Sequence, residues 1–239
     1  MEPPTDLGAD SIRDEKVKVI RSLRQMSPDD VAKNVVRGQY TAGAIGGQEV
    51  KDYRSEDRVN PQSMTETYVA LKVNVDNWRW EGVPFRLCTG KRLAERYTQI
   101  VITFRHVSHW LFEKPSREKA TPNRMVFRLQ PEENIELGLM SSLAAPDWGA
   151  LELQPLPLDL SMPVSPRRRI AYERLLLDAL NGNTALFVRN DEVEAAWTWI
   201  DSVAAAWELA GTPILPYLAG SWGPGEAAAY LQGTARRSA

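Results

Sequence analysis

Cysteine and histidine are nearly absent from this sequence. Cys88 is its single cysteine, which excludes an internal disulfide and any cysteine-rich zinc site. His106 and His109 are its only histidines, so a histidine-based metal cluster is not expected either. No apolar run is long enough to span a membrane, and the first residues lack the character of a signal peptide. We therefore expect a cytoplasmic protein that binds no metal and has no membrane partner.

An excess of charge of one sign is also missing. The 29 Lys and Arg residues nearly balance the 31 Asp and Glu residues, giving a net charge of −2, and no cationic tract stands out. No nucleic-acid partner is therefore expected. A dinucleotide-binding fingerprint is missing too, because Gly43, Gly46 and Gly47 lie in a polar stretch and not between a strand and a helix.

Most of the chain between Val35 and Leu160 has the pattern of β-strands. Polar and apolar residues alternate there, with turns and no helices between the runs. Such an order favours a mostly antiparallel sheet. The predicted strands are 35–40, 65–76, one beginning at 85, 99–104, 123–130 and 134–143, followed by alternating runs over 151–154 and 156–160. The stretch 41–60, with three glycines and many charges, is predicted to be a long mobile loop.

Helical spacing of apolar residues marks both ends of the chain. It predicts helices over 10–20, over 169–180 and from 191 to about 210, and a short helix over 226–231. Ser27 and Pro28 begin a further short turn or helix. The predicted fold class is α+β, with one large, mostly antiparallel β-sheet and helices packed on one face. We expect one domain over 1–231 and a disordered tail over 232–239.

The stretch 84–104 carries the most suggestive chemistry. Gly90 permits a turn, and Lys91, Arg92 and Arg96 place three cations within six residues, ahead of the predicted strand 99–104. Converging cations beside a turn suit the phosphate or carboxylate of a small anionic ligand. An ordinary solvated turn between strands is the alternative at this point.

Several segments, in order and spacing, resemble the C-terminal domain of glucose-6-phosphate dehydrogenase, in its bacterial form. The similarity runs from about Met1 to Leu231 and rests on many short motifs together. The segments are 13–19, 36–40, 77–85, 90–91, 123–124, 128–131, 172–178, 187–189, 191–197 and 219–224.

The resemblance implies a substrate, a cofactor and a partner. In that family Lys91 and Arg96 correspond to two cations that bind glucose 6-phosphate, and Gln130 corresponds to a glutamine that contacts the substrate. The family oxidises D-glucose 6-phosphate to the 6-phosphoglucono-lactone with NADP, as the first step of the pentose phosphate pathway. Its sheet forms the dimer contact, which implies a homo-oligomer. Arg37 and Arg128 could serve an anion site or form salt bridges within the sheet.

The sequence also departs from the family. Cys88 stands where members usually carry an arginine, and Tyr97 and Val101 do not reproduce the pattern of a second, structural NADP site. That second site is therefore not predicted. The lone imidazoles of His106 and His109 match no catalytic position and are interpreted as structural.

The Rossmann domain and the catalytic histidine of the family have no counterpart in these residues. No catalytic, cofactor-binding or metal-binding residue is therefore predicted. We expect the chain to be inactive alone, or active only when paired with a separately encoded N-terminal half. Two alternatives remain open: a non-catalytic assembly subunit and a stand-alone module that binds sugar phosphates.

Overall fold

The computed structural model describes residues 1–105, 121–131, 133–144, 151–160, 171–225 and 227. The chain divides into two compact units. The first comprises 1–94 and 167–231, and the second comprises 95–166 and 232–239. His106, His109 and the predicted tail 232–239 lie outside the described residues, as does the predicted helix 226–231 apart from Ala227.

The first unit contains a four-stranded mixed sheet in the order β10-β1-β4-β5. Strand β4 (Tyr68–Val73) pairs antiparallel with β1 (Val35–Thr41) and with β5 (Phe85–Gly90). Strand β10 (Ile214–Leu218) pairs parallel with β1. Because β10 comes from the far end of the sequence, this pairing ties the two parts of the unit together.

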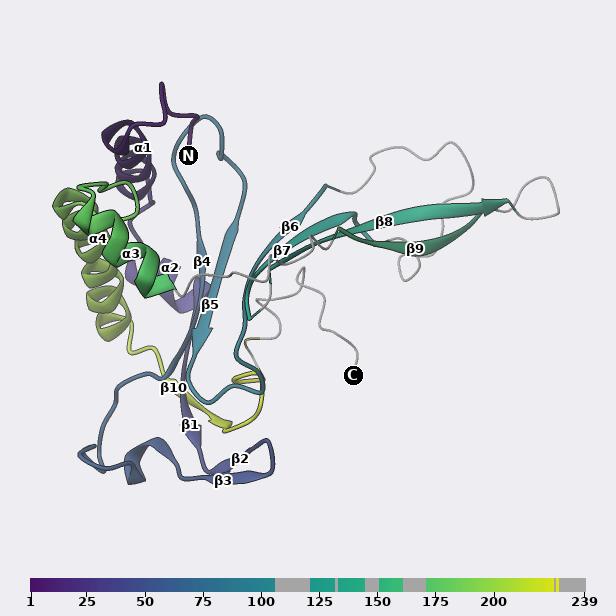
Figure 1. Ribbon diagram of the computed structural model, residues 1–239. Coiled ribbons are helices and arrows are strands. Elements are labelled where there is room, and N and C mark those ends of the chain that lie inside the picture. The colour runs from purple at the N-terminus through teal and green to yellow at the C-terminus, as the bar shows by residue number, and fades with distance from the viewer. Residues whose placement is uncertain (106–120, 132, 145–150, 161–170, 226, 228–239) are drawn as a thin grey trace. The chain divides into compact units, whose positions relative to one another are not determined.

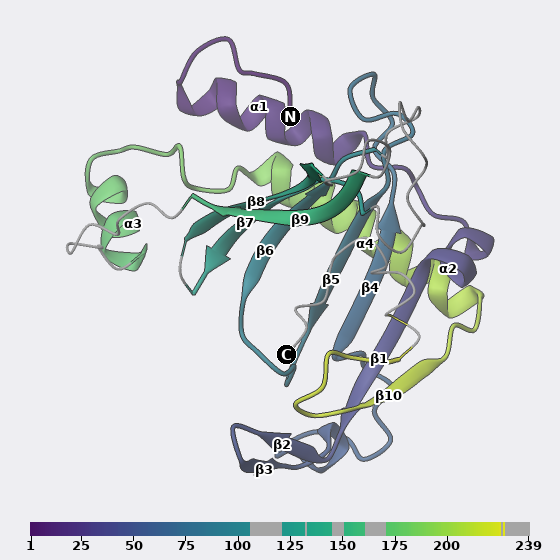
Figure 2. The ribbon, with the colours of Figure 1, turned by 90° about the vertical axis from the view of Figure 1, so that its right-hand side faces the viewer.

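Helices cover one side of this sheet. Helices α1 (Ala9–Arg21), α2 (Pro28–Asn34) and α4 (Asn190–Leu209) all lie on that side, as Figures 1 and 2 show. Helix α3 (Ala171–Leu180) belongs to the same unit. The predicted arrangement of helices on one face is therefore confirmed for this sheet.

The start of α2 shows how a local signal fixes an element. The Ser27 side chain accepts a hydrogen bond from the backbone N–H of Asp30, and the Asp30 carboxylate accepts one from the backbone of Ser27. This reciprocal capping satisfies two N–H groups that the first turn leaves without partners. Pro28 then occupies the first helical position, where a missing N–H costs nothing.

Alternation along β1 and β4 divides the core into two clusters. On the helix side, buried apolar residues of the sheet pack against α2 and α4: Val31, Val35, Leu71, Val73, Trp199, Val203, Ala206 and Trp207. On the opposite side, aromatic and small residues pack around β10 and the segment after it: Val36, Tyr40, Tyr68, Ala70, Tyr217, Ala219 and Ala227. Adjacent residues such as Val35 and Val36 thus serve different clusters, as the period of two requires.

The second unit contains a four-stranded antiparallel sheet in sequence order. Its strands are β6 (Thr98–Thr103), β7 (Arg124–Gln130), β8 (Asn134–Ala144) and β9 (Leu151–Asp159). The α+β class and the mostly antiparallel pairing are therefore confirmed. Within the described residues the strands are shared between two four-stranded sheets and a small hairpin.

The prediction of a long mobile loop over 41–60 is wrong. Strands β2 (Gly43–Ile45) and β3 (Gln48–Val50) form a hairpin, and a 3₁₀ turn, η1 (Tyr53–Ser55), follows. Gly46 and Gly47 have φ of 56° and 80°. Two consecutive positive φ values suit a tight hairpin turn, so these glycines close a turn.

The spacing of apolar residues predicts α4 but does not identify its packing face. Trp197 and Ile200 both fit that spacing, yet they are 61% and 41% exposed. Trp199 is 4% exposed instead, and its indole Nε1 donates to the carbonyl oxygen of Arg24 at 3.0 Å. Two tryptophans two residues apart point to different faces, and spacing alone does not identify the buried one.

Candidate functional site

Lys91 begins the turn that follows β5 in the first unit. Its backbone N–H donates to the carbonyl oxygen of Thr67 at 2.8 Å. Its side chain is exposed, and the ammonium forms no ion pair with any residue in the described part of the chain. The backbone of this cation is therefore fixed while its charge faces solvent.

Position 90, just before Lys91, has no room for a side chain and therefore requires glycine. A Cβ atom at this position would lie 2.7 Å from Cδ2 of Tyr68 and 3.1 Å from Leu93. Real Cβ atoms do not approach a ring carbon this closely, so a side chain would displace the Tyr68 ring or the strand. The glycine lets β5 pack closely enough to place Lys91 directly after the sheet.

Arg92, the next cation, already has a partner. A terminal guanidinium nitrogen lies 3.2 Å from Oε1 of Glu56, and the Tyr40 hydroxyl donates to the same oxygen at 3.0 Å. Hydrogen bonding to Tyr40 and Glu56 raises the pKa of Arg92 above its usual value. Its φ of 52° lies in the left-handed region, so the backbone turns at this residue.

The cleft beside Arg92 carries both signs of charge. Its volume is about 330 Å³, and Lys91 does not line it. The lining residues are Ile45, Gln48, Glu49, Val50, Lys51, Glu56 and Arg92. Because two carboxylates accompany the two cations, this cleft does not select an anion.

Arg96 and Gln130 lie at the same end of the β6–β7 pair in the second unit. Gln130 is the register partner of Thr98, and Arg96 is two residues before Thr98. Both side chains are exposed. The structure therefore brings together two of the three predicted binding residues, and the third, Lys91, belongs to the first unit.

Arg37 and Arg128 form salt bridges, as one of the two alternatives predicted. A terminal nitrogen of Arg37 lies 2.9 Å from a carboxylate oxygen of Glu66, and the Arg37 guanidinium stacks over the Trp207 ring at 4.7 Å. Arg128 lies 3.4 Å from Glu136. These contacts occupy both guanidinium groups, so neither contributes an open cation.

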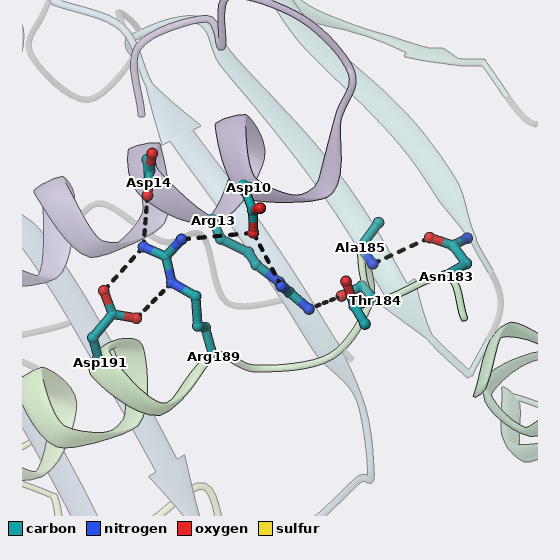
Figure 3. Close-up of polar contacts among 8 residues, drawn as sticks. All are labelled: Asp10, Arg13, Asp14, Asn183, Thr184, Ala185, Arg189 and Asp191. Carbon is teal, nitrogen blue, oxygen red and sulfur yellow. Dashed lines mark hydrogen bonds and ion pairs between the residues drawn. The ribbon is translucent and has the colours of Figure 1, made fainter.

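A cluster of ions joins α1 to the start of α4. Figure 3 shows the Arg189 guanidinium between carboxylates of both helices, at 2.7 Å from Asp191 and 2.6 Å from Asp14. Asp10 lies 3.8 Å from Arg189 and 3.4 Å from Arg13. Hydrogen bonds from Arg189 to Asp191 and Asp14 raise the pKa of its guanidinium. Carboxylates compensate these cations, so the cluster is a helix contact and not an anion site.

Cys88 provides no charge near the turn. Its thiol donates to the Tyr68 hydroxyl at 3.0 Å, and burial raises the pKa of the thiol above its usual value. A neutral thiol therefore occupies position 88, where the resemblance implies an arginine.

Metal and membrane features are absent from the described residues. No three His, Cys, Asp or Glu side chains gather there in an arrangement that could hold a metal ion. Within the same part of the chain, no helix combines the length and the apolar character needed to cross a membrane.

Residues 1–238 match the sequence profile of a known domain, "Glucose-6-phosphate dehydrogenase, C-terminal domain". The chain belongs to the glucose-6-phosphate dehydrogenase family. This confirms the resemblance drawn from the motifs.

Relatives agree with this membership. Glucose-6-phosphate 1-dehydrogenase of Rhizobium meliloti (strain 1021) is 46% identical over 234 residues, which are 97% of this chain and 47% of that protein. The enzyme of the same name from Dickeya dadantii (strain 3937) is 45% identical over 227 residues, which are 94% of this chain and 46% of that protein. The chain thus spans about half the length of these relatives.

Solved structures confirm the fold. Glucose-6-phosphate dehydrogenase in complex with its substrate glucose-6-phosphate matches with a TM-score of 0.80 and 30% identity, over 100% of this chain and 48% of that one. The crystal structure of glucose-6-phosphate 1-dehydrogenase from Mycobacterium avium matches with a TM-score of 0.74 and 34% identity, over 100% of this chain and 46% of that one.

The cations of this glucose-6-phosphate dehydrogenase domain are evident in the sequence, but the hydrogen bond that holds the Lys91 turn is not. Tyr217 donates to the carbonyl oxygen of Lys91 at 2.8 Å, across 126 positions of sequence. The apolar run Ile214–Leu218 could have identified the strand that carries Tyr217, but the contact itself has no local signal.

Proposed function

We propose that this chain, over residues 1–231, supplies the part of glucose-6-phosphate dehydrogenase that holds the phosphate of glucose 6-phosphate. The observation that carries the proposal is the exposed ammonium of Lys91 on a backbone fixed by Thr67. A phosphate monoester carries between one and two negative charges at neutral pH and is attracted to such a cation.

Arg96 and Gln130 complement this role. The guanidinium of Arg96 can bind two phosphate oxygens at once, and the amide of Gln130 can both donate to and accept from sugar hydroxyls. Their positions at one end of the β6–β7 pair support a joint role. The solved relative with bound glucose-6-phosphate shows that a protein of this fold takes this ligand.

NADP is proposed to bind to the part of the relatives that this chain does not span. The glycine cluster of the sequence forms the β2–β3 hairpin, whereas a dinucleotide needs a glycine-rich turn between a strand and a helix. The described residues thus do not fit the cofactor, and no step of hydride transfer is assigned to them.

In the complete enzyme, the chain would orient the sugar phosphate for oxidation to the lactone, the first step of the pentose phosphate pathway in the cytoplasm. Orientation lowers the barrier but supplies neither the hydride acceptor nor the base. We therefore expect no NADP reduction by the purified 239-residue chain with glucose 6-phosphate. Turnover near the rate of a complete enzyme would contradict this.

Isothermal titration calorimetry of the 239-residue chain with glucose 6-phosphate tests the binding role. Lys91→Ala and Arg96→Ala should each weaken binding by about tenfold or more, since each removes a charge-assisted contact. Lys51→Ala is the matched control, because Lys51 is an exposed lysine of the first unit that is not assigned to the site. Absence of binding by the parent chain, or equal affinities of parent and Lys91→Ala, would refute the proposal.

A second candidate role, self-association, is favoured by the second sheet. Ile102, Met125, Leu137 and Leu158 are successive register partners across its four strands, so they share one face. Large apolar side chains in this unit remain exposed: Ile100 52%, Ile102 43%, Phe104 46%, Leu129 44%, Leu156 43%, Leu158 39% and Leu160 53%. An apolar sheet face of this kind suits a second copy of the chain.

Size-exclusion chromatography with light scattering tests this role. The parent chain should be a dimer, and Ile102→Lys or Leu158→Lys should give a monomer, because a buried charge opposes association. Gln99→Lys is the control, since Gln99 lies on the same strand and is not on the face of Ile100 and Ile102. A parent chain that is monomeric at high concentration would exclude the role.

A further inference from the structure

Tyr217 carries a buried hydroxyl that reaches the Lys91 turn. The residue is 4% exposed, and its ring packs against Tyr40 and Tyr68 with centroid separations of 6.3 Å and 5.6 Å. Its Oη lies 2.8 Å from the carbonyl oxygen of Lys91. The rings fix where this hydroxyl lies, and the hydroxyl fixes where the Lys91 carbonyl lies.

Thr67 completes a directed chain of hydrogen bonds. Its Oγ1 accepts from the backbone N–H of Tyr40 at 3.0 Å and lies 3.0 Å from Oη of Tyr217. A phenol has one proton, and two carbonyl oxygens that only accept are within its reach, that of Lys91 at 2.8 Å and that of Thr67 at 3.1 Å. The shorter contact assigns the proton to Lys91. The Tyr217 oxygen then accepts from the Thr67 hydroxyl. The chain therefore runs from the backbone of β1 through Thr67 and Tyr217 to Lys91.

The rest of the turn is fixed by the segment after β10. The backbone N–H of Gly220 donates to the carbonyl oxygen of Arg92 at 2.8 Å, and that of Ala94 donates to Ser221 at 3.0 Å. Burial raises the pKa of the Tyr217 phenol, so this donor keeps its proton at neutral pH. Both backbone polar groups of Lys91 are thus satisfied by the folded chain, whereas its ammonium has no partner among the residues that the structure describes.

We propose that Tyr217 is a positioning residue of the phosphate site, which determines where the Lys91 ammonium meets the ligand. The inference rests on the proposed function, since it takes Lys91 as the cation that binds phosphate. A lysine side chain has four flexible torsions, so its affinity for an anion depends on an anchored backbone. Tyr217 supplies that anchor without touching the ligand.

Two measurements on the 239-residue chain test this role with Tyr217→Phe. Amide hydrogen exchange at Lys91, followed by NMR, should accelerate about tenfold more than exchange at the core residue Val203. The dissociation constant for glucose 6-phosphate should rise about fivefold. Tyr40→Phe is the matched control, because Tyr40 is buried in the same cluster but its hydroxyl donates to Glu56. It should leave both quantities within about twofold of the parent.

Three outcomes would overturn the positioning role: unchanged Lys91 exchange and affinity in Tyr217→Phe, equal acceleration at Lys91 and Val203, or the same changes in Tyr40→Phe. If Tyr217→Phe does not fold, Thr67→Val is the alternative variant, because it removes the Thr67 hydroxyl that lies 3.0 Å from the Tyr217 hydroxyl. Amide exchange at Lys91 should again accelerate, and the dissociation constant for glucose 6-phosphate should again rise. If neither changes, the positioning role is overturned. Failure of the proposed function has a different signature, because the parent then binds no glucose 6-phosphate whatever the exchange rates show.

Discussion

The cations of the α1–α4 contact and those of the Lys91 turn are held in opposite ways. In the contact, the Arg189 charge meets Asp191 at 2.7 Å and Asp14 at 2.6 Å (Figure 3). In the turn, the backbone of Lys91 is bonded to Thr67 and Tyr217, while its ammonium forms no ion pair within the described residues.

This difference separates structural cations from candidate binding cations. A charge compensated by carboxylates stabilises the contact that it makes and has little attraction left for an anion. A cation that has no carboxylate partner adds nothing to stability. When its backbone is fixed, such a cation can bind an anionic ligand at little cost in entropy. Removing a charge from the contact should therefore change stability, whereas removing the charge of Lys91 should change ligand binding.

The largest effect is expected for Gly220→Ala. The backbone N–H of Gly220 donates to the carbonyl oxygen of Arg92 and so holds the Lys91 turn. Gly220 has φ of 86°, and a Cβ atom there would lie 2.0 Å from the carbonyl oxygen of Ala44. Both the clash and the left-handed backbone oppose a side chain, so the free energy of unfolding should fall by about 3 kcal/mol or more. Urea denaturation followed by tryptophan fluorescence measures this fall.

Gly182→Ala is the control for Gly220→Ala. Gly182 also has a positive φ, 67°, but nothing lies within 4 Å of the added Cβ atom. Its cost should be limited to about 1–2 kcal/mol, from the backbone conformation alone. Equal losses in the two variants would show that close packing against Ala44 does not hold the turn.

Arg13→Ala should have the next largest effect and tests the other region. Arg13 is 8% exposed, donates to the carbonyl oxygen of Thr184 and lies 3.4 Å from Asp10. Losing this packing and these bonds should lower the free energy of unfolding by about 2 kcal/mol. Affinity for glucose 6-phosphate, measured by calorimetry well below the unfolding transition, should not change.

Arg21→Ala provides the comparison on the same helix. Arg21 is exposed, so its removal should change the free energy of unfolding by less than about 0.5 kcal/mol. If Arg13→Ala weakened ligand binding while Lys91→Ala left it intact, the assignment of the two regions would have to be exchanged.

The sequence predicted the sheets well because strand alternation is a local property. It missed β10, because its parallel pairing with β1 joins residues far apart and Pro216 within it reads as a breaker. It also missed the β2–β3 hairpin, since strands of three residues are too short to show a period.

The candidate site was predictable only as a set of cations. Lys91 and Arg92 are adjacent and chemically similar in the sequence, and nothing local shows which of them is paired. The positive φ of Arg92 and the position of Glu56 decide that, and both depend on the folded chain. No local sequence pattern predicts the contact between the Tyr217 hydroxyl and Lys91 either, because the two residues are 126 positions apart.

The smallest expected effect concerns acid stability of the α1–α4 contact. The Arg189 guanidinium holds the pKa of Asp191 below its usual value. A carboxyl whose pKa is lower in the folded state stabilises the fold above its unfolded pKa of about 3.9. This stabilisation is lost as the pH falls through the folded pKa, so part of the acid unfolding below about pH 4 should come from Asp191.

Asp191→Asn should therefore reduce stability slightly at pH 7 and flatten its decline below about pH 4, in urea titrations at a series of pH values. Asp201→Asn is the control, because Asp201 is an exposed acid on the same helix with no ion pair in the described structure; it should leave the pH profile unchanged. Asp191 is only partly buried, which keeps the effect small, since water and salt screen the pair. Identical acid profiles for Asp191→Asn and the parent would show that Asp14 alone is enough to compensate Arg189.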